Sequence, residues 1–173
     1  MDEPTLPTAS SLSTLPDSTI EQILNLLFEP TPELTSLLIP QIRTHNPQSY
    51  TSLSTIALQT LSSLPPDSPQ LHAILAAHPR LGAKKVDSTH SQSEQKSLGS
   101  DGEREQLQAL NEEYEARFPG LRYVVFVNGR SREVVMGDMR ERIETGTMEG
   151  EVRKASQAMC DIAVDRARKL GQE

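Results

Sequence analysis

The chain has 173 residues, of which 24 are acidic and 17 basic, so its net charge is −7 at pH 7. A chain of this length fits one compact domain. Nucleic-acid binding needs a basic stripe that displaces counterions, so the acidic balance argues against DNA or RNA as a partner. With no tryptophan, three tyrosines and three phenylalanines, the core must be largely aliphatic, which favours packed helices over an all-β sandwich.

Cysteine usage and the chain ends bear on the compartment. The single cysteine, Cys160, cannot form an internal disulfide, and no Cys/His pairs at zinc spacing are present. No stretch approaches the roughly 20 apolar residues that cross a bilayer, and the first residues are acidic where a signal peptide carries positive charge. We therefore expect a soluble, cytoplasmic protein that does not bind membranes. A peroxisomal location is the alternative, although Gly171-Gln172-Glu173 is not the import tripeptide.

Composition divides the chain into two parts. Residues 1–15 are rich in proline, serine and threonine and carry few large apolar side chains, which predicts a loose N-terminal arm before a helical domain over residues 16–173. The first helix of that domain is expected to end before Pro30 and Pro32. Its buried stripe is predicted to comprise Ile20, Ile23, Leu24 and Leu27.

Helical periodicity continues through most of the chain. A short apolar segment over residues 34–42 leads to a longer helix, for which Asn46 is the expected cap and Pro47 the first residue. The later stripes expected to be buried are Leu53, Ile56, Ala57 and Leu61; Leu71, Ile74 and Leu75; Leu107, Leu110, Tyr114 and Phe118; Val135, Met139 and Ile143; and Val152, Ala155, Met159 and Ile162. Residues 123–128 are the exception, with strong β character. The sequence therefore predicts an all-α, single-domain helical bundle with one short extended segment near 123–128.

His78 is the first candidate for chemistry. It continues the apolar stripe of the preceding helix, and Pro79 requires that helix to stop at or before it. The negative end of a helix favours a charged imidazole by roughly 0.3 to 1 kcal/mol, whereas burial favours the neutral form. These opposing effects predict a pKa near neutrality, which suits proton transfer. The alternative is a hydrogen-bonded core histidine without a chemical role.

The pentapeptide Ser91-Gln92-Ser93-Glu94-Gln95 has two interpretations. It matches a capping box, in which Ser91 accepts a backbone hydrogen bond and Glu94 reaches back to the cap amide. Alternatively, Glu94 and Gln95 project from the first turn of a helix into a pocket, where free backbone amides and the helix dipole favour anions. The residue types alone leave both interpretations open.

Arg166 interrupts an apolar face. It lies seven residues after Met159, within about 20° of the buried stripe of the last helix. A cation there pairs with an internal carboxylate such as Glu94, binds an anionic ligand, or extends from the helix end to water. Cys160 has mid-stripe spacing in the same helix and is expected to be a small buried hydrophobe rather than a nucleophile.

Other catalytic signatures are missing from the sequence. It contains no GxSxG elbow, no phosphate-binding loop, no GxGxxG after a strand and no HExxH helix. Nucleotide-dependent and metal-dependent chemistry therefore lose support.

Several motifs together resemble one family in order and spacing. They are His78-Pro79-Arg80-Leu81-Gly82, Ser91-Gln92-Ser93-Glu94-Gln95, Leu110-Asn111-Glu112-Glu113-Tyr114 with Phe118, the segment from Tyr123 to Gly129, and the closing helix from Gln157 to Leu170. Over roughly residues 12–170 the chain resembles the 2-oxo-4-hydroxy-4-carboxy-5-ureidoimidazoline (OHCU) decarboxylases of urate breakdown. The resemblance implies an all-helical domain, decarboxylation of this small-molecule substrate to (S)-allantoin with neither a cofactor nor a metal, and a homodimer.

The resemblance also implies roles for individual residues. His78 resembles the family's catalytic histidine and proton donor, and Glu94 is expected to steer it. The residues implied to bind substrate are Pro79, Ser91, Gln95, Val124, Val125, Phe126, Val127, Asn128 and Arg166. The segment from Val124 to Asn128 would do so through its backbone, and Arg166 would receive the negative end of the substrate.

Two positions depart from the family pattern. Arg80 stands where the family commonly has Asp after His-Pro, and Asn128 stands where many members have Arg before Gly. The first departure is expected to affect only the rim of the site. The second removes a charge from the pocket, which would leave Arg166 as the remaining cation that anchors the substrate.

The chemistry of the substrate agrees with these residues. Loss of carbon dioxide leaves an electron pair that the neighbouring C=N bond of the imidazoline can accept, so the protein needs only to orient the carboxylate, stabilise developing charge and deliver one proton. Two other functions remain open: a non-catalytic helical binding module, and a hydrolase of a ureido compound in which His78 activates water. Release of carbon dioxide rather than ammonia or urea would separate the two enzymes.

Overall fold

In the computed structural model, residues 5–83 and 101–172 are described, and they form helices joined by short connections. The helices are η1 (Ala9–Thr14, a 3-10 helix), α1 (Asp17–Leu27), α2 (Pro32–His45), α3 (Tyr50–Ser62), α4 (Pro69–Ala76), α6 (Asp101–Arg117), α7 (Arg132–Thr145) and α8 (Met148–Lys169). No strand occurs within these residues. The prediction of an all-α domain is therefore confirmed.

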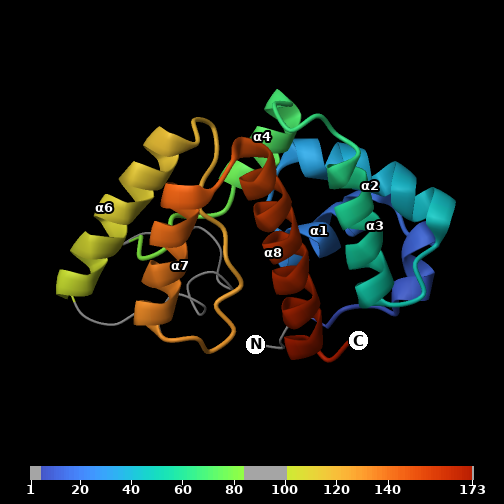
Figure 1. Ribbon diagram of the computed structural model, residues 1–173. Helices are drawn as coiled ribbons and strands as arrows, with labels where there is room; N and C mark the ends of the chain where they lie inside the picture. The colour runs from blue at the N-terminus through green and yellow to red at the C-terminus, as the bar shows by residue number, and fades with distance from the viewer. Residues whose placement is uncertain (1–4, 84–100, 173) are drawn as a thin grey trace.

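Helix α8 is the central helix of the fold (Figure 1). Helix α3 packs along it most extensively, and α1 and α4 also pack against it, while α2 covers α1, α3 and α4. Helices α6 and α7 pack on each other and stand on the opposite side of α8 from α3 (Figure 1). Residues 121–130 connect this pair without regular structure and run between α7 and α8. The extended segment predicted near 123–128 is part of this connection.

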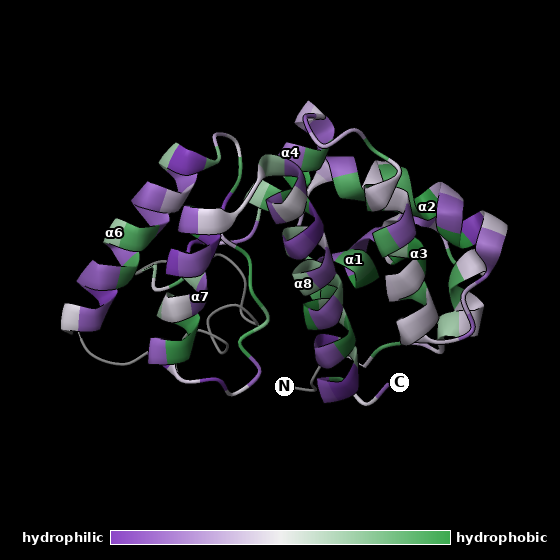
Figure 2. Ribbon diagram, viewed as in Figure 1, coloured by the Kyte–Doolittle hydropathy of each residue, from purple (hydrophilic) through white to green (hydrophobic). Residues whose placement is uncertain are grey.

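Most of the predicted stripes form the core. All the predicted residues on α1, α4, α6 and α8 are buried, whereas Ile56 on α3 and Ile143 on α7 are only partly buried. Helices α6 and α7 are more hydrophilic than α1 to α4 (Figure 2). A buried arginine, Arg142, lies beside Ile143 on α7, so polar side chains contribute to the interior on this side of the molecule. None of the described helices is both long and apolar enough to span a membrane.

The N-terminal segment differs from the predicted loose arm. Leu6, Ala9 and Leu12 are buried. Ala9 and Leu12 share one face because a 3-10 helix has three residues per turn, and Leu6 lies in the segment that leads into this helix. Tyr50 donates a hydrogen bond to the carbonyl oxygen of Pro7 at 2.9 Å, and burial raises the pKa of Tyr50 to about 12. The prediction of a loose arm is wrong for residues 5–15, because a few well-spaced apolar side chains are enough to attach them.

Asn46 also differs from its predicted role. It ends α2 with φ 44°, in the left-handed region that asparagine tolerates. Helix α3 is instead capped by Ser49, whose hydroxyl accepts a hydrogen bond from the Ser52 amide at 3.0 Å. The Ser52 hydroxyl in turn accepts one from the Ser49 amide at 3.0 Å. This reciprocal capping box starts the helix three residues later than expected.

Candidate functional site

His78 lies just beyond the end of α4, where the chain turns away from the helix. Ser68 caps the start of α4, and Ala77 closes it directly before His78 and Pro79. The side chain of His78 is 5% exposed, and its carbonyl oxygen accepts a hydrogen bond from Arg122 at 3.2 Å. The ring nitrogen Nε2 has no hydrogen-bond partner among the described residues. A buried ring nitrogen without a partner is available to a ligand, which favours the functional interpretation of His78.

Arg166 pairs with a carboxylate that sequence reasoning missed. The guanidinium Nη2 donates to Glu29 Oε1 at 2.9 Å, and Nη1 donates to the Leu27 carbonyl oxygen at 3.2 Å. Arg166 is 1% exposed and Glu29 is 6% exposed. Of the three options for Arg166, extension to water is therefore wrong, because the guanidinium is enclosed by the end of α1. No periodicity pointed to Glu29, since it follows the last residue of that helix and lies outside its stripe.

His78, Glu29 and Arg166 form one electrostatic cluster. Burial lowers the pKa of His78 to about 4; the Glu29 carboxylate raises it and the Arg166 guanidinium lowers it, both by smaller amounts. The expected pKa near neutrality is therefore too high, because the loss of hydration outweighs the other effects. At pH 7 the imidazole is neutral, with one N–H group and one lone pair to offer.

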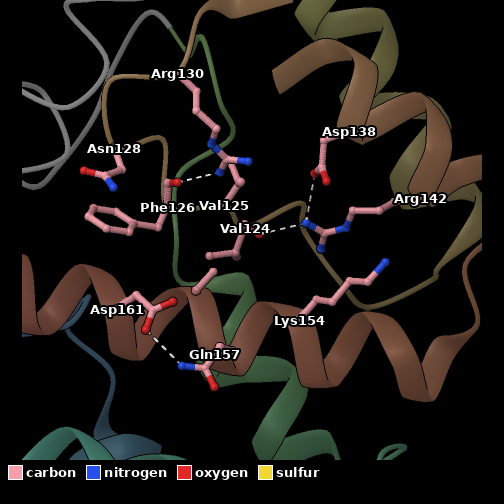
Figure 3. A pocket seen from close by; sticks show the side chains of 11 residues that line it. Val124, Val125, Phe126, Asn128, Arg130, Asp138, Arg142, Lys154, Gln157 and Asp161 are labelled. Atoms are coloured by element: carbon pink, nitrogen blue, oxygen red, sulfur yellow. Dashed lines mark hydrogen bonds and ion pairs between the residues drawn. The ribbon is translucent and has the colours of Figure 1, made fainter. Parts of the chain in front are cut away.

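The segment implied to contact substrate lines a pocket of about 430 Å³ between itself, α7 and α8 (Figure 3). Its lining residues are Val124, Val125, Phe126, Asn128, Arg130, Asp138, Arg142, Lys154, Gln157, Ala158 and Asp161. Val127 does not line it, and neither do His78 or Arg166. Arg122, shortly before the segment, nevertheless contacts the His78 backbone. Ser91, Glu94 and Gln95 lie outside the described residues.

Asn128 is at the turn that ends the extended segment. Its φ is 45°, and that of Gly129 is 73°. The Arg130 amide donates to the Val127 carbonyl oxygen at 2.9 Å, and the Arg130 guanidinium donates to the Phe126 carbonyl oxygen at 2.6 Å (Figure 3). A cation is therefore present at this turn, but two positions after Asn128. Arg130 lines the same pocket as Asn128, and the expected effect of Asn128 on substrate anchoring stays a prediction.

A buried polar network holds the start of this segment. Arg142 Nε donates to Glu151 Oε2 at 2.7 Å, and Arg142 Nη1 donates to the Val124 carbonyl oxygen at 3.2 Å. Tyr114 donates to the same Glu151 oxygen at 2.8 Å. The Arg142 guanidinium lies 4.5 Å from the centre of the Tyr123 ring, close enough for a cation–π contact. Burial raises the pKa of both tyrosines. The network fixes the backbone of the extended segment between α7 and α8.

The sequence does contain a signal for this network. Glu151 lies four residues before Ala155, on the buried stripe of α8, and Arg142 lies three residues after Met139, on that of α7. The reasoning that singled out Arg166 applies equally to both residues. A pair of opposite charges on two apolar stripes predicts a buried ion pair between the two helices.

Arg80 is paired rather than free at the rim. It donates to Glu115 through Nε at 2.8 Å and through Nη2 at 2.6 Å. The hydrogen bonds to Glu115 raise the pKa of Arg80. Arg80 and Asn111 help to line a second pocket of about 710 Å³. The prediction that the departure at Arg80 affects only the rim stays a prediction.

No group of three or more His, Cys, Asp or Glu side chains in the described part of the chain is arranged to hold a metal ion.

Comparison with known proteins places this fold in a family. The family model described as OHCU decarboxylase matches residues 13–168. The chain belongs to the OHCU decarboxylase family. A crystal structure of (S)-allantoin synthase is similar to it, with a TM-score of 0.65, 18% sequence identity and coverage of 95% of this chain and 54% of that one. The likeness at this identity shows the fold, and the chain spans about half the length of that synthase. No curated protein matches the sequence.

The family match includes the cluster around His78. The matched range includes Glu29, His78 and Arg166. These residues come from the end of α1, the end of α4 and the last turns of α8, three elements that pack together. The arrangement can accept or donate a proton at His78 and hold positive charge at Arg166.

Proposed function

We propose that the protein decarboxylates OHCU to (S)-allantoin in urate breakdown, without a cofactor, and that His78 transfers the proton that sets the configuration of the product. The observation that carries the proposal is the buried imidazole whose Nε2 has no partner among the described residues, beside the ion pair of Arg166 and Glu29. The membership of the chain in the OHCU decarboxylase family also supports the proposal.

The reaction moves protons in two stages. When the C4 carboxylate leaves as carbon dioxide, the electron pair of the broken bond forms a C4=C5 double bond, and the ring nitrogen of the former C=N bond takes a proton. The resulting enol then loses the proton of its C4 hydroxyl and gains one at C5. The net change consumes one proton and releases one carbon dioxide. Delivery of the C5 proton to one face gives a single enantiomer of the product.

A neutral imidazole suits the second stage. With a pKa near 4, His78 can accept the C4 hydroxyl proton, and the imidazolium so formed is a strong enough acid to protonate C5. A bound anionic substrate beside the ring raises the pKa of His78, because a negative charge favours the protonated form. Proton transfer of this kind contributes typically 10²- to 10⁴-fold to the rate.

The other proposed contacts follow the family resemblance. Arg166 receives the negative end of the substrate, and Glu94 steers His78. The ring and ureido groups are bound by Ser91, Gln95, Pro79 and the backbone from Val124 to Asn128. Support for the last element comes from its backbone, which has no regular secondary structure and so does not use its amide groups in a helix or a sheet.

The test follows freshly generated OHCU by circular dichroism, with the wild type, His78→Gln and His45→Gln side by side. His45 is exposed at the end of α2, so it is the matched control for loss of a histidine. We expect wild type and His45→Gln to accelerate formation of (S)-allantoin, and His78→Gln to lose about 10²- to 10⁴-fold of the rate. Decay at the spontaneous rate to racemic product with the wild type would refute the decarboxylase assignment.

The same assay separates the alternatives. Carbon dioxide release supports the carboxy-lyase, and ammonia or urea release supports a hydrolase of a ureido compound. Binding of OHCU without turnover supports a non-catalytic helical module. The clustering of a histidine, an arginine and a glutamate in the interior favours an enzyme, since burying three such groups costs stability that a scaffold has no reason to lose.

Two further proposals concern assembly and location. We propose a homodimer, as the resemblance implies, and light scattering of the full chain tests it. We propose the cytoplasm as its compartment. Cys160 supports this proposal as a buried free thiol, a state that a reducing compartment maintains. Imaging of the full-length protein in cells would distinguish cytoplasm from peroxisome.

A further inference from the structure

We propose that Glu29 is a positioning residue for the reaction: it holds the Arg166 guanidinium in the orientation in which that cation receives the negative end of the substrate. The inference rests on the proposed function, because it takes Arg166 as the anchor of the substrate. Neither the sequence motifs nor the family resemblance assigned a role to Glu29.

The geometry fixes the guanidinium at two nitrogens. Nη2 bonds to the Glu29 carboxylate at 2.9 Å and Nη1 to the Leu27 carbonyl oxygen at 3.2 Å. A guanidinium is planar, so contacts at two of its nitrogens determine both the position and the tilt of the plane. Both acceptors come from the last residues of α1 and the connection after it. The end of α1 therefore determines the direction of the donors on Arg166.

Stability alone is a poor explanation for this pair. Taking two charges out of water costs several kcal/mol for each ion, and well-packed apolar residues often serve a core equally well. Arg166 and Glu29 are nonetheless among the most deeply buried charged groups of the described chain. Both lie close enough to His78 to act on its imidazole. Arg166 and Glu29 thus lie beside the proposed proton-transfer group, where the orientation of the guanidinium affects substrate binding.

Glu29 also limits the charge of the site. The Glu29 carboxylate offsets positive charge of the Arg166 guanidinium next to the imidazole. The orientation that Glu29 gives to the guanidinium then determines how that group meets the negative end of the substrate. We therefore expect Glu29 to affect substrate binding through Arg166, without contacting the substrate itself.

The test compares steady-state kinetics of wild type, Glu29→Gln and the control Glu21→Gln on OHCU. Glu21 lies on the exposed face of α1, so its variant removes a nearby charge without touching the pair. For Glu29→Gln we expect KM to rise about tenfold while kcat changes less, because the lost interaction orients a group that binds substrate before and during the reaction. For Glu21→Gln we expect wild-type values.

A double-mutant cycle separates positioning from a structural role. In the Arg166→Lys background, Glu29→Gln is expected to produce no further rise in KM, because lysine has no plane to orient. Melting curves of each variant show which are folded at the assay temperature. If Glu29→Gln does not fold, Glu29→Asp keeps the charge but withdraws it by one methylene, and the same rise in KM is expected.

Each outcome decides the question. An active wild type with unchanged KM in folded Glu29→Gln or Glu29→Asp overturns the inference and leaves the proposed function intact. The same holds for an equal rise in KM in the Arg166→Lys background, because the effect of Glu29 would then not pass through Arg166. A wild type that does not decarboxylate OHCU overturns the proposed function and the inference with it.

Discussion

Burial of a neutral histidine makes the fold sensitive to acid. His78 has a pKa of about 4 in the folded chain, against its ordinary value of 6.5, and burial is the main cause. Between these two pH values the unfolded chain binds a proton at His78 that the folded chain does not. The free energy of unfolding therefore rises with pH through this window. The contribution of the neutral His78 is fully present above about pH 6.5 and is lost as the pH falls toward 4.

The size of the effect follows from the two pKa values. A shift from 6.5 to about 4 makes the unfolded state about 2 kcal/mol more favourable at pH 5.0 than at pH 7.5. We expect His78→Gln to abolish this part of the pH dependence, because glutamine does not titrate. The substitution is also expected to shift stability by a constant amount at all pH values, and this shift cancels when the pH dependence is compared.

The assay is urea unfolding of wild type, His78→Gln and His45→Gln at pH 7.5, 6.0 and 5.0. The free energy of unfolding of the wild type should fall between pH 7.5 and 5.0 by about 2 kcal/mol more than that of His78→Gln. His45→Gln, at an exposed position, is expected to follow the wild type. Equal losses for wild type and His78→Gln would refute the reasoning, since His78 would then titrate alike in both states.

Three other predictions concern groups away from His78. Glu151→Gln is expected to lower the free energy of unfolding by about 3 kcal/mol, because it removes the closer and fully buried of the two carboxylates that pair with Arg142. The exposed Glu149→Gln should change it by less than about 1 kcal/mol, and similar losses for the two variants would contradict the burial argument. Burial raises the pKa of Cys160 to about 12, so we expect a thiol reagent to modify this cysteine only in denaturant. Rapid labelling of the native protein would contradict this, because it would show that the thiol is accessible. Asn128→Val is expected to lower the free energy of unfolding by about 1 to 2 kcal/mol, because φ at this position is 45°. Asn128→Gly is not expected to lower it, and equal stability of both variants would show that the turn relaxes.

The location of the site was partly predictable. The apolar stripe leading to His78, with Pro79 after it, predicted an inward-facing histidine at a helix end. The spacing from Met159 placed Arg166 on the apolar face of the last helix but left open whether its guanidinium extends to water. Both features depend only on the geometry of a single helix, which 3.6 residues per turn determines. The aliphatic stripes that predicted an all-α core depend on the same geometry.

The partners of these residues were decided by the tertiary structure. Glu29 follows the end of α1, where no periodicity tells the direction of a side chain, and it meets Arg166 across 137 positions of sequence. The burial that lowers the pKa of His78, and the charges of Glu29 and Arg166 that act on it, likewise depend on which helices pack together. A sequence pattern reports which face of a helix is buried, but the group opposite that face is known only when the helices are assembled, and that group determines what the site can do.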